Sequence, residues 1–227
     1  MRHIKKGDKV ILIDNLSRKG TVLNLDLLKN FANVLFYKTD IRNKPAVEKI
    51  FLKHRDAQII YHLAAQVAVT SSVINPYEDF EINVLGTLNI LETMRRHKIK
   101  GFLFFSSTNK VYGGMDDVKI KLINNRYQYL DYKKGINEKF LLDFHSPYGC
   151  SKGAAEQYVR DYHRIYGLNT VVFRQSCIYG ENQFGVEDQG WVAYFTIAAI
   201  LDLPITIYGD GKQVRDVLYI DDLIKAY

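Results

Sequence analysis

The chain has 227 residues, of which 47% are hydrophobic and 25% are charged, and its formal net charge is +6. This composition excludes intrinsic disorder and fibrous repeats, and the length is sufficient for the core of one α/β domain. No run approaches the roughly 20 apolar residues of a membrane span, and basic residues are interspersed with acidic ones, so we expect a cytoplasmic protein without membrane or nucleic-acid partners.

Short apolar runs alternate with longer amphipathic stretches along the chain. That alternation is typical of strands covered on both faces by helices, and therefore of a parallel sheet. We find no repeats and no low-complexity linker, so we predict one domain over residues 1–227. The predicted strands are residues 9–13, 34–37, 58–63, 101–105 and 170–173.

Two helices are predicted between these strands. The first runs from about Glu78 to His97, with Pro76 near its start, and its expected buried face carries Phe80, Val84, Leu88 and Leu91. The second runs from about Pro147 to Tyr166, between Ser146 and Gly167 as capping residues. Residues 114–145 are polar, aromatic and weakly periodic, which predicts a long loop.

The strongest chemical signal is a tyrosine and a lysine four residues apart in the second helix. Tyr148 and Lys152 share one helix face, and a nearby ammonium lowers the pKa of a tyrosine toward the range of proton exchange with a substrate hydroxyl. Ser106, Ser107 and Thr108 follow the strand at residues 101–105, where open α/β sheets place their sites. Thr108 beside Tyr148 can hold a sugar oxygen while hydride moves to a nicotinamide.

Residues at the ends of other predicted strands are expected to contact the cofactor. Asp14 follows the predicted strand at residues 9–13, and an acidic residue after the second strand of a dinucleotide-binding fold accepts the ribose hydroxyls, which favours NAD over NADP. Small side chains after the third strand let the backbone approach a cofactor. The expected cofactor-binding residues are Asp14, Asn15, Asp40, Ile41, Leu63, Ala64, Ala65, Gln66, Ser106, Tyr148 and Lys152. The two cysteines, Cys150 and Cys177, have no metal-binding spacing and predict reduced, mostly buried thiols and no metal site.

Several strings together resemble a known family. The trio Thr108, Tyr148 and Lys152, the string Asn-Val-Leu-Gly-Thr-Leu-Asn at 83–89 and Gly-Asp-Gly-Lys-Gln-Val-Arg-Asp at 209–216 are similar to the extended short-chain dehydrogenase/reductase family, in its epimerase and dehydratase branch. The similarity covers essentially the whole chain. Strings at 107–113, 146–153, 174–180 and 183–191 most resemble members that invert carbon 2 of a CDP-linked 3,6-dideoxyhexose.

The resemblance implies an NAD-dependent isomerase acting on a nucleotide sugar, and the expected substrate is a CDP-hexose in lipopolysaccharide O-antigen synthesis. It implies that Tyr148 is the acid/base, that Lys152 holds the nicotinamide ribose, and that Thr108 orients the substrate hydroxyl. It also implies substrate contacts from Ser176 and from Arg215, whose guanidinium would pair with the diphosphate. Residues from about 175 to 227 would supply substrate-binding elements. The helices around Asn83 and Tyr148 would form the interface of a homodimer or larger homo-oligomer.

The chain departs from the family pattern at both ends. The family's glycine-rich fingerprint lies roughly 20 residues before the acidic residue, whereas Asp14 is only 13 residues after Met1. The expected fold is therefore a doubly wound, Rossmann-like parallel sheet lacking its first strand and glycine-rich loop, with residues 2–7 as the tail of the first helix. Residues 219–227 would be the start of a helix that precedes the rest of the substrate-binding portion.

Other functions remain open from the sequence. A 4-epimerase would use the same scaffold, and so would a 4,6-dehydratase, although dehydratases typically carry an Asp-Glu pair where this chain has Asn109 and Lys110. A non-catalytic nucleotide sensor would not need Thr108, Tyr148 and Lys152 together. An inactive truncated fragment is the remaining alternative, and it would be poorly soluble and retain no NAD.

Overall fold

The computed structural model describes all 227 residues and divides into two compact units. The first unit comprises Met1–Gln66, Tyr77–Ser106 and Ala154–Val172, and the second comprises Val67–Pro76, Ser107–Gly153 and Phe173–Tyr227. Four elements, which comprise residues 76–80, 102–108, 146–166 and 170–175, contain residues of both units.

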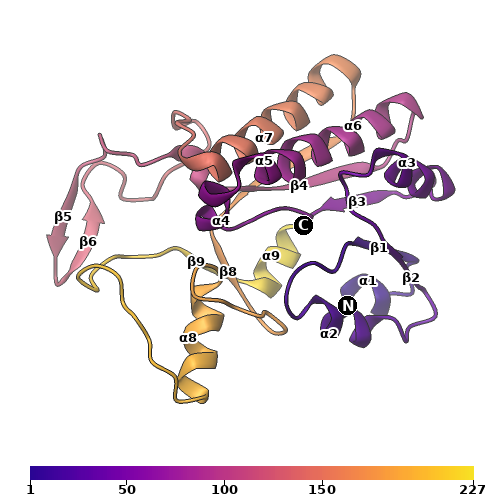
Figure 1. Cartoon of the computed structure of the whole chain (residues 1–227). Coiled ribbons are helices and arrows are strands. Elements are labelled where there is room, and N and C mark those ends of the chain that lie inside the picture. The colour runs from indigo at the N-terminus through magenta and orange to yellow at the C-terminus, as the bar shows by residue number, and fades with distance from the viewer. The chain divides into compact units, whose positions relative to one another are not determined.

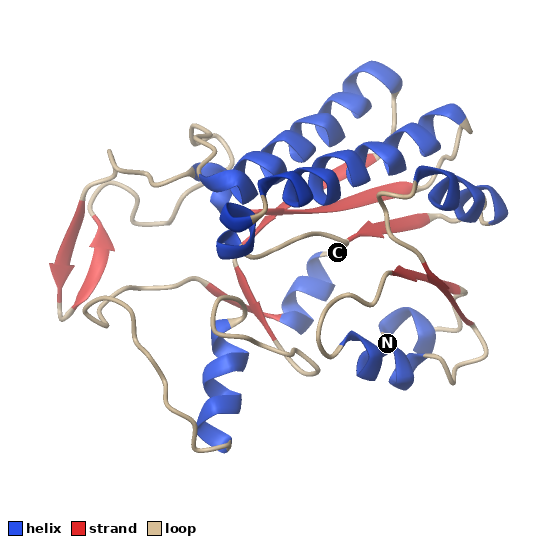
Figure 2. Ribbon diagram, viewed as in Figure 1, coloured by secondary structure: helices blue, strands red, loops and turns tan.

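The first unit contains parallel strands and the helices between them (Figures 1 and 2). Its strands form a β1-β2 pair and a sheet in the order β3-β4-β7, and both the β1-β2 and the β3-β4 pairings are parallel. The elements that lie in or enter this unit are α1 (Arg2–Lys5), β1 (Val10–Asp14), α2 (Thr21–Leu28), β2 (Val34–Lys38), α3 (Lys44–Lys53), β3 (Ile59–His62), α5 (Pro76–Phe80), η1 (Glu81–Leu85), α6 (Gly86–Arg96), β4 (Phe102–Thr108), α7 (Ser146–Tyr166) and β7 (Thr170–Gln175).

The core of the first unit lies between β4, α3, α6 and the later part of α7. Leu91, Met94 and Leu103 are fully buried, and Val159 of α7 packs into the same cluster. α6 and α7 run side by side (Figure 1), and the Tyr162 hydroxyl donates a hydrogen bond of 2.7 Å to Glu92 between them. This packing fixes α7 against the sheet along its second half.

The second unit consists of short elements and of the beginning of α7. Its remaining elements are α4 (Val69–Ile74), η2 (Asn109–Tyr112), β5 (Ile120–Ile123), β6 (Arg126–Tyr129), β8 (Cys177–Tyr179), α8 (Trp191–Ile200), β9 (Val217–Tyr219) and α9 (Ile220–Ala226). β8 and β9 pair in parallel, whereas β5 and β6 form an antiparallel hairpin.

The structure confirms the predicted parallel α/β architecture, all five strands and both helices. α7 begins at Ser146, whose Oγ accepts a hydrogen bond from the Gly149 amide, and it ends before Gly167, which has a φ of 71°. The first predicted helix is continuous from Pro76 to Arg96 as α5, η1 and α6, with a π-helical segment in its middle. None of the helices is both long and apolar enough to cross a membrane.

Three local expectations were wrong. The predicted loop at 114–145 contains the β5–β6 hairpin, which the pattern missed because β5 is exposed on both faces and does not alternate; Asn124 and Asn125, both with positive φ, form its two-residue turn. Phe80 is 54% exposed, because the polar residues Asp79 and Asn83 occupy the buried face at that end. Both cysteines are free, but Cys150 is exposed in the first turn of α7.

Candidate active site

The three residues expected to be catalytic all lie in the second unit, and all are buried. Thr108 ends β4, and its Oγ accepts a hydrogen bond of 3.2 Å from the Lys110 amide, which starts η2. Tyr148 and Lys152 lie one turn apart at the start of α7 and are 8% and 3% exposed. A buried lysine ammonium requires polar partners, so this part of α7 is a polar site within an otherwise packed interior.

The first turn of α7 lies against the segment that follows Thr108. A Cβ atom at Gly149 would be only 3.3 Å from the Lys110 carbonyl oxygen, so the backbones of the two segments approach closely at this point. At Gly153 a Cβ would meet the Phe144 ring at 2.5 Å. The geometry therefore brings the beginning of α7, with Tyr148, next to the chain that carries Thr108.

Ser72 of α4 holds the beginning of α7 in place. Its side chain is fully buried, its Oγ accepts a hydrogen bond of 3.1 Å from the Tyr148 amide, and its hydroxyl donates to the Val69 carbonyl at 2.6 Å. The first amides of a helix have no partner within the helix. Ser72 supplies one from another segment, at the residue whose side chain is expected to move protons.

We predict that Ser72→Ala destabilises the protein by about 1–2 kcal/mol, because a buried amide of α7 loses its acceptor. Urea unfolding followed by circular dichroism measures this loss. Ser71→Ala is the matched control, since Ser71 is the exposed neighbour on the same helix, and it should change the free energy of unfolding by less than about 0.5 kcal/mol. Equal effects of the two substitutions would contradict the capping role of Ser72.

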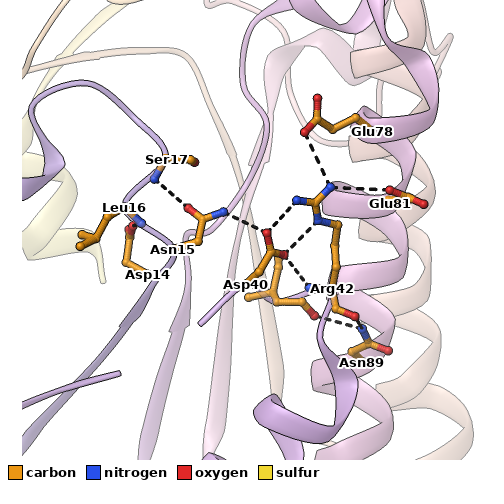
Figure 3. A network of polar contacts seen from close by, with 10 residues as sticks. Asp14, Asn15, Leu16, Ser17, Asp40, Arg42, Glu78, Glu81 and Asn89 are labelled. Carbon is orange, nitrogen blue, oxygen red and sulfur yellow. Dashed lines mark hydrogen bonds and ion pairs between the residues drawn. The ribbon is translucent and has the colours of Figure 1, made fainter. Parts of the chain in front are cut away.

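The expected ribose-binding residue, Asp14, lies in the first unit in a tight turn after β1 (Figure 3). Its Oδ1 accepts a hydrogen bond of 2.6 Å from the Leu16 amide, and Leu16 has a φ of 60°. The Asn15 Oδ1 accepts a hydrogen bond from the Ser17 amide at 3.0 Å. Asp14 itself is exposed at the carboxyl end of its strand, so its second carboxylate oxygen is available to a ligand.

Asp40 is held by an arginine that sequence reasoning missed. Its Oδ1 accepts hydrogen bonds from the Arg42 amide and Nε at 2.9 and 3.0 Å, and its Oδ2 accepts from Arg42 Nη2 at 2.8 Å and from Asn15 Nδ2 at 3.0 Å. Arg42 also lies within 3.7 Å of Glu78 and 3.6 Å of Glu81 (Figure 3). Asp40 therefore links the turn after β1 to the helix that begins with α5.

The Arg42 guanidinium, through its hydrogen bonds, lowers the pKa of Asp40 to about 2. A depressed carboxyl pKa stabilises the fold above the ordinary value near 3.8, and that contribution is lost as the pH falls through about 2. Glu92 behaves similarly, because hydrogen bonds from Arg95 bring its pKa to about 2. The protein should thus lose stability between about pH 4 and pH 2.

We predict that Asp40→Asn removes one of these two contributions. Near pH 3 the free energy of unfolding should then vary less steeply with pH, by roughly 1 kcal/mol per pH unit. Urea unfolding at several pH values between 2 and 5 measures the slope. Asp26→Asn is the control, since Asp26 forms only an exposed ion pair with Lys29, and an unchanged slope in Asp40→Asn would refute the role of Arg42.

Hydrogen bonds to Asp79 and Asn83 anchor the loop after β3 to the helix that begins with α5. The Gln66 amide donates to Asn83 Oδ1 at 3.0 Å, Asn83 Nδ2 donates to the Gln66 carbonyl at 3.1 Å, and Gln66 Nε2 donates to Asp79 Oδ1 at 3.0 Å. Leu63 and Ala64 remain exposed before it. The loop is consequently fixed at Gln66, whereas Leu63 and Ala64, which were expected to face a cofactor, are exposed to solvent.

The remaining predicted cofactor residues differ in burial. Ile41 is buried in the core of the first unit, and its carbonyl accepts a hydrogen bond of 3.0 Å from Asn89 Nδ2. Ala65 and Ser106 are half-buried, and Ser106 directly precedes the residues of β4 that belong to the second unit. Ile41 can therefore contact a ligand only through its edge or its backbone.

The predicted substrate residues lie beside β8 and β9 in the second unit. Ser176 precedes β8, and its hydroxyl donates a hydrogen bond of 2.6 Å to the Asp216 carbonyl, directly before β9. Arg215 precedes Asp216 and is exposed. The parallel pairing of the two strands therefore brings Ser176 and Arg215 into one neighbourhood.

Comparison with known proteins places these observations in a family. The family model described as "NAD dependent epimerase/dehydratase family" matches residues 2–227. The chain belongs to the NAD-dependent epimerase/dehydratase family. This agrees with the resemblance derived from the sequence strings, with the Rossmann-type fold, and with an enzyme of the nucleotide-sugar epimerase class.

Individual members of the family are similar over nearly the whole chain. A CDP-paratose 2-epimerase of Salmonella typhi is 49% identical over 99% of this chain and 68% of its own length. A putative UDP-glucose 4-epimerase of Methanocaldococcus jannaschii is 37% identical over 98% of this chain and 65% of its length. The solved structure of a Thermus thermophilus UDP-glucose 4-epimerase in complex with NAD has a TM-score of 0.81 at 32% identity, covering 99% of this chain and 67% of that one. The chain thus spans about two thirds of the length of each of these three relatives.

The structure adds three positions of this epimerase/dehydratase chain that sequence reasoning missed. Ser72 gives no signal, because its role is a contact between segments 76 residues apart. Arg42 could have been predicted from its spacing to Asp40, since a guanidinium can donate two parallel hydrogen bonds to a carboxylate two residues earlier in the chain. Asp79 was missed because the apolar pattern of its helix indicated a buried face formed by other residues. No three histidine, cysteine, aspartate or glutamate side chains lie close enough to hold a metal ion.

Proposed function

We propose that the protein carrying this chain inverts carbon 2 of a CDP-linked 3,6-dideoxyhexose, converting CDP-paratose to CDP-tyvelose. The observation that supports this most is the buried set of Thr108, Tyr148 and Lys152 in one unit, in a chain that is 49% identical to a CDP-paratose 2-epimerase. The strings around these residues are the ones that most resemble that group of enzymes.

The proposed reaction needs an acid/base that works in both directions. Tyr148 takes the proton of the carbon 2 hydroxyl as the carbon is oxidised, and returns it when the keto sugar is reduced on its other face. NAD, when bound, supplies the chemistry of accepting a hydride and giving it back, so there is no net redox change. Lys152 holds the nicotinamide ribose beside Tyr148, and Thr108 orients the hydroxyl that reacts.

The residues of the first unit fit an NAD adenosine. Asp14 presents an exposed carboxylate where ribose hydroxyls would bind, and Asp40, already occupied by Arg42 and Asn15, keeps the turn in shape rather than contacting the base through its side chain. Leu63 and Ala64 are exposed beside the anchored Gln66. Residues 1–227 contain no Gly-x-Gly-x-x-Gly string, so we assign no pyrophosphate contacts within the chain.

We assign the nucleotide diphosphate to Arg215 and a sugar contact to Ser176, within substrate-binding elements from about residue 175 onward. Arg215 is exposed, and a guanidinium pairs well with phosphate oxygens. We also propose a cytoplasmic homodimer or larger homo-oligomer. Large apolar side chains are exposed on the helices around Asn83 and in the later part of α7, including Tyr77, Phe80, Tyr158 and Ile165.

The second candidate is 4-epimerisation of a UDP-sugar, which the 37% identity to a putative UDP-glucose 4-epimerase favours. Purified protein incubated with NAD and either CDP-paratose or UDP-glucose separates the two, with the sugar ring of the product identified by NMR. Conversion of CDP-paratose to CDP-tyvelose is expected. Conversion of UDP-glucose to UDP-galactose alone would favour the second candidate, and no conversion of either sugar would leave a nucleotide sensor or an inactive fragment.

A further inference from the structure

The segment between α8 and β9 has little apolar packing to hold it in place. It comprises residues 201–216, contains no helix or strand, and is exposed at every residue except Lys212, which is half-buried. Regions with few buried apolar contacts are the ones that open most easily. The conformation of this segment, which carries Arg215, therefore depends on its polar contacts within the second unit.

A bend at residues 209–211 is closed by hydrogen bonds within the segment. The glycines on either side of Asp210 have φ values of 88° and 72°, a region that favours glycine. The Asp210 Oδ1 accepts a hydrogen bond of 3.0 Å from the Lys212 amide, and Gln213 Nε2 donates one of 2.6 Å to the Tyr208 carbonyl. The other carboxylate oxygen of Asp210 is left for a contact outside the bend.

That contact comes from Tyr127 of the β5–β6 hairpin, 83 residues earlier in the chain (Figure 1). The Tyr127 hydroxyl donates a hydrogen bond of 2.9 Å to Asp210 Oδ2, and the Tyr127 amide donates one of 3.3 Å to the Lys212 carbonyl. Tyr127 is half-buried, whereas the residues at both ends of β6 are exposed. One residue of the hairpin thus binds both the side chain and the backbone of the bend.

The backbone on both sides of Arg215 is held by contacts of this kind. Before it, the bend is bound to the hairpin, and the Tyr208 hydroxyl donates a hydrogen bond of 2.9 Å to Glu187 Oε1. After it, the Asp216 carbonyl accepts a hydrogen bond of 2.6 Å from the Ser176 hydroxyl. The Arg215 side chain itself is exposed, so a fixed backbone presents a guanidinium that a ligand can reach.

The bond to Tyr127 also determines where the negative charge of Asp210 lies. The Lys212 amide and the Tyr127 hydroxyl lower the pKa of Asp210 below its ordinary value, so this side chain is a carboxylate at neutral pH. These two donors occupy one oxygen each. A carboxylate released from the hairpin would compete with phosphate oxygens for the Arg215 guanidinium, because carboxylates and phosphates accept the same paired hydrogen bonds.

We propose that Tyr127 is a positioning residue for the diphosphate of the nucleotide sugar. It holds the bend at 209–211 in the form in which Arg215 meets the phosphate oxygens, and it keeps the Asp210 carboxylate away from them. The inference rests on the proposed function, because that function assigns Arg215 to the diphosphate. It gives the β5–β6 hairpin a part in substrate binding that acts through the bend.

The first measurement requires no nucleotide. Trypsin cleaves after Lys212, and exposed loops are cut faster when they are less ordered. Tyr127→Phe removes only the hydroxyl, and cleavage after Lys212 should then be at least about threefold faster than in the parent protein. Tyr129→Phe, on the same strand at a residue that is 38% exposed, is the matched control and should leave the rate unchanged. Cleavage after Lys29, in the first unit, should be the same in all three proteins.

The second measurement is the affinity for CDP by isothermal titration calorimetry. Tyr127→Phe should weaken CDP binding by about five- to tenfold, as expected for coupled neighbours, and Tyr129→Phe should not weaken it. In an Arg215→Ala background Tyr127→Phe should change the affinity by less than about twofold, because Tyr127 acts through Arg215. In turnover of CDP-paratose the KM of Tyr127→Phe should rise by the same factor as the loss of CDP affinity, while kcat stays within about twofold.

The outcomes separate this inference from the proposed function. Cleavage of Tyr127→Phe after Lys212 at the parent rate would overturn the inference, and so would faster cleavage with unchanged CDP affinity. An equal loss of affinity with and without Arg215 would also overturn it, since Tyr127 would then act on the fold in general. A parent protein that binds no CDP would overturn the proposed function and the positioning role together, and this failure is seen before any variant is made.

Discussion

Replacing Tyr148 by phenylalanine is expected to lower kcat of the epimerisation by about 10²–10⁴-fold, the usual contribution of a positioned acid/base. The substitution removes only the phenolic oxygen from a side chain that is 8% exposed, so the ring still fills its place. The measurement is steady-state turnover of the CDP-sugar in the presence of NAD. Far-ultraviolet circular dichroism of the variant should match the parent.

Tyr158→Phe is the matched control for this experiment. Tyr158 lies on the same helix, α7, but is 44% exposed and belongs to the first unit. Its substitution should leave kcat within twofold. A Tyr148→Phe enzyme with more than a tenth of the parent activity would mean that another group moves the proton.

Replacing Gly113 by alanine is expected to destabilise the protein by about 3 kcal/mol or more. Gly113 follows η2 with φ 70° and ψ −151°, a backbone region that is essentially restricted to glycine and costs other residues about 1–3 kcal/mol. A Cβ there would also lie 2.2 Å from the Asp143 carbonyl oxygen, a backbone atom that cannot move aside like a flexible side chain. Overpacking of this kind typically adds about 1–3 kcal/mol.

Gly135→Ala isolates the conformational part of the effect. Gly135 also has a positive φ, of 87°, but a Cβ there would meet nothing within 4 Å. Its substitution should cost about 1 kcal/mol. Thermal or urea unfolding of both variants gives the difference, and equal losses would show that the Asp143 contact does not constrain the segment after Thr108.

The strand positions could be predicted from the sequence because their physical cause is local. Strands such as Val34–Lys38 and Phe102–Thr108 carry concentrated β-branched and aromatic residues, and the period of such runs is visible without a partner. Likewise, Tyr148 and Lys152 could be predicted from their spacing, because residues four apart lie on the same face of any helix. The ends of α7 were also predictable, since Ser146 and Gly167 act within a few residues of the helix.

Contacts between distant segments could not be predicted in this way. The bond from Tyr148 to Ser72 spans 76 residues, and serine in α4 looks like any exposed polar residue. The buried Asp79 and Asn83 contradict the rule that apolar residues form the inner face, because their partner is the loop at Gln66. Two-stranded hairpins such as β5–β6 escape pattern analysis since neither face is buried.

The central claim is that Tyr148, Lys152 and Thr108 serve oxidation and reduction at one sugar carbon. CDP-paratose carrying deuterium at carbon 2, incubated in ordinary water with the enzyme and NAD, tests it most directly. We predict CDP-tyvelose that retains the deuterium at carbon 2, because the hydride that leaves this carbon returns to it. A product that has lost the deuterium to solvent, or a sugar inverted at carbon 4, would contradict the account.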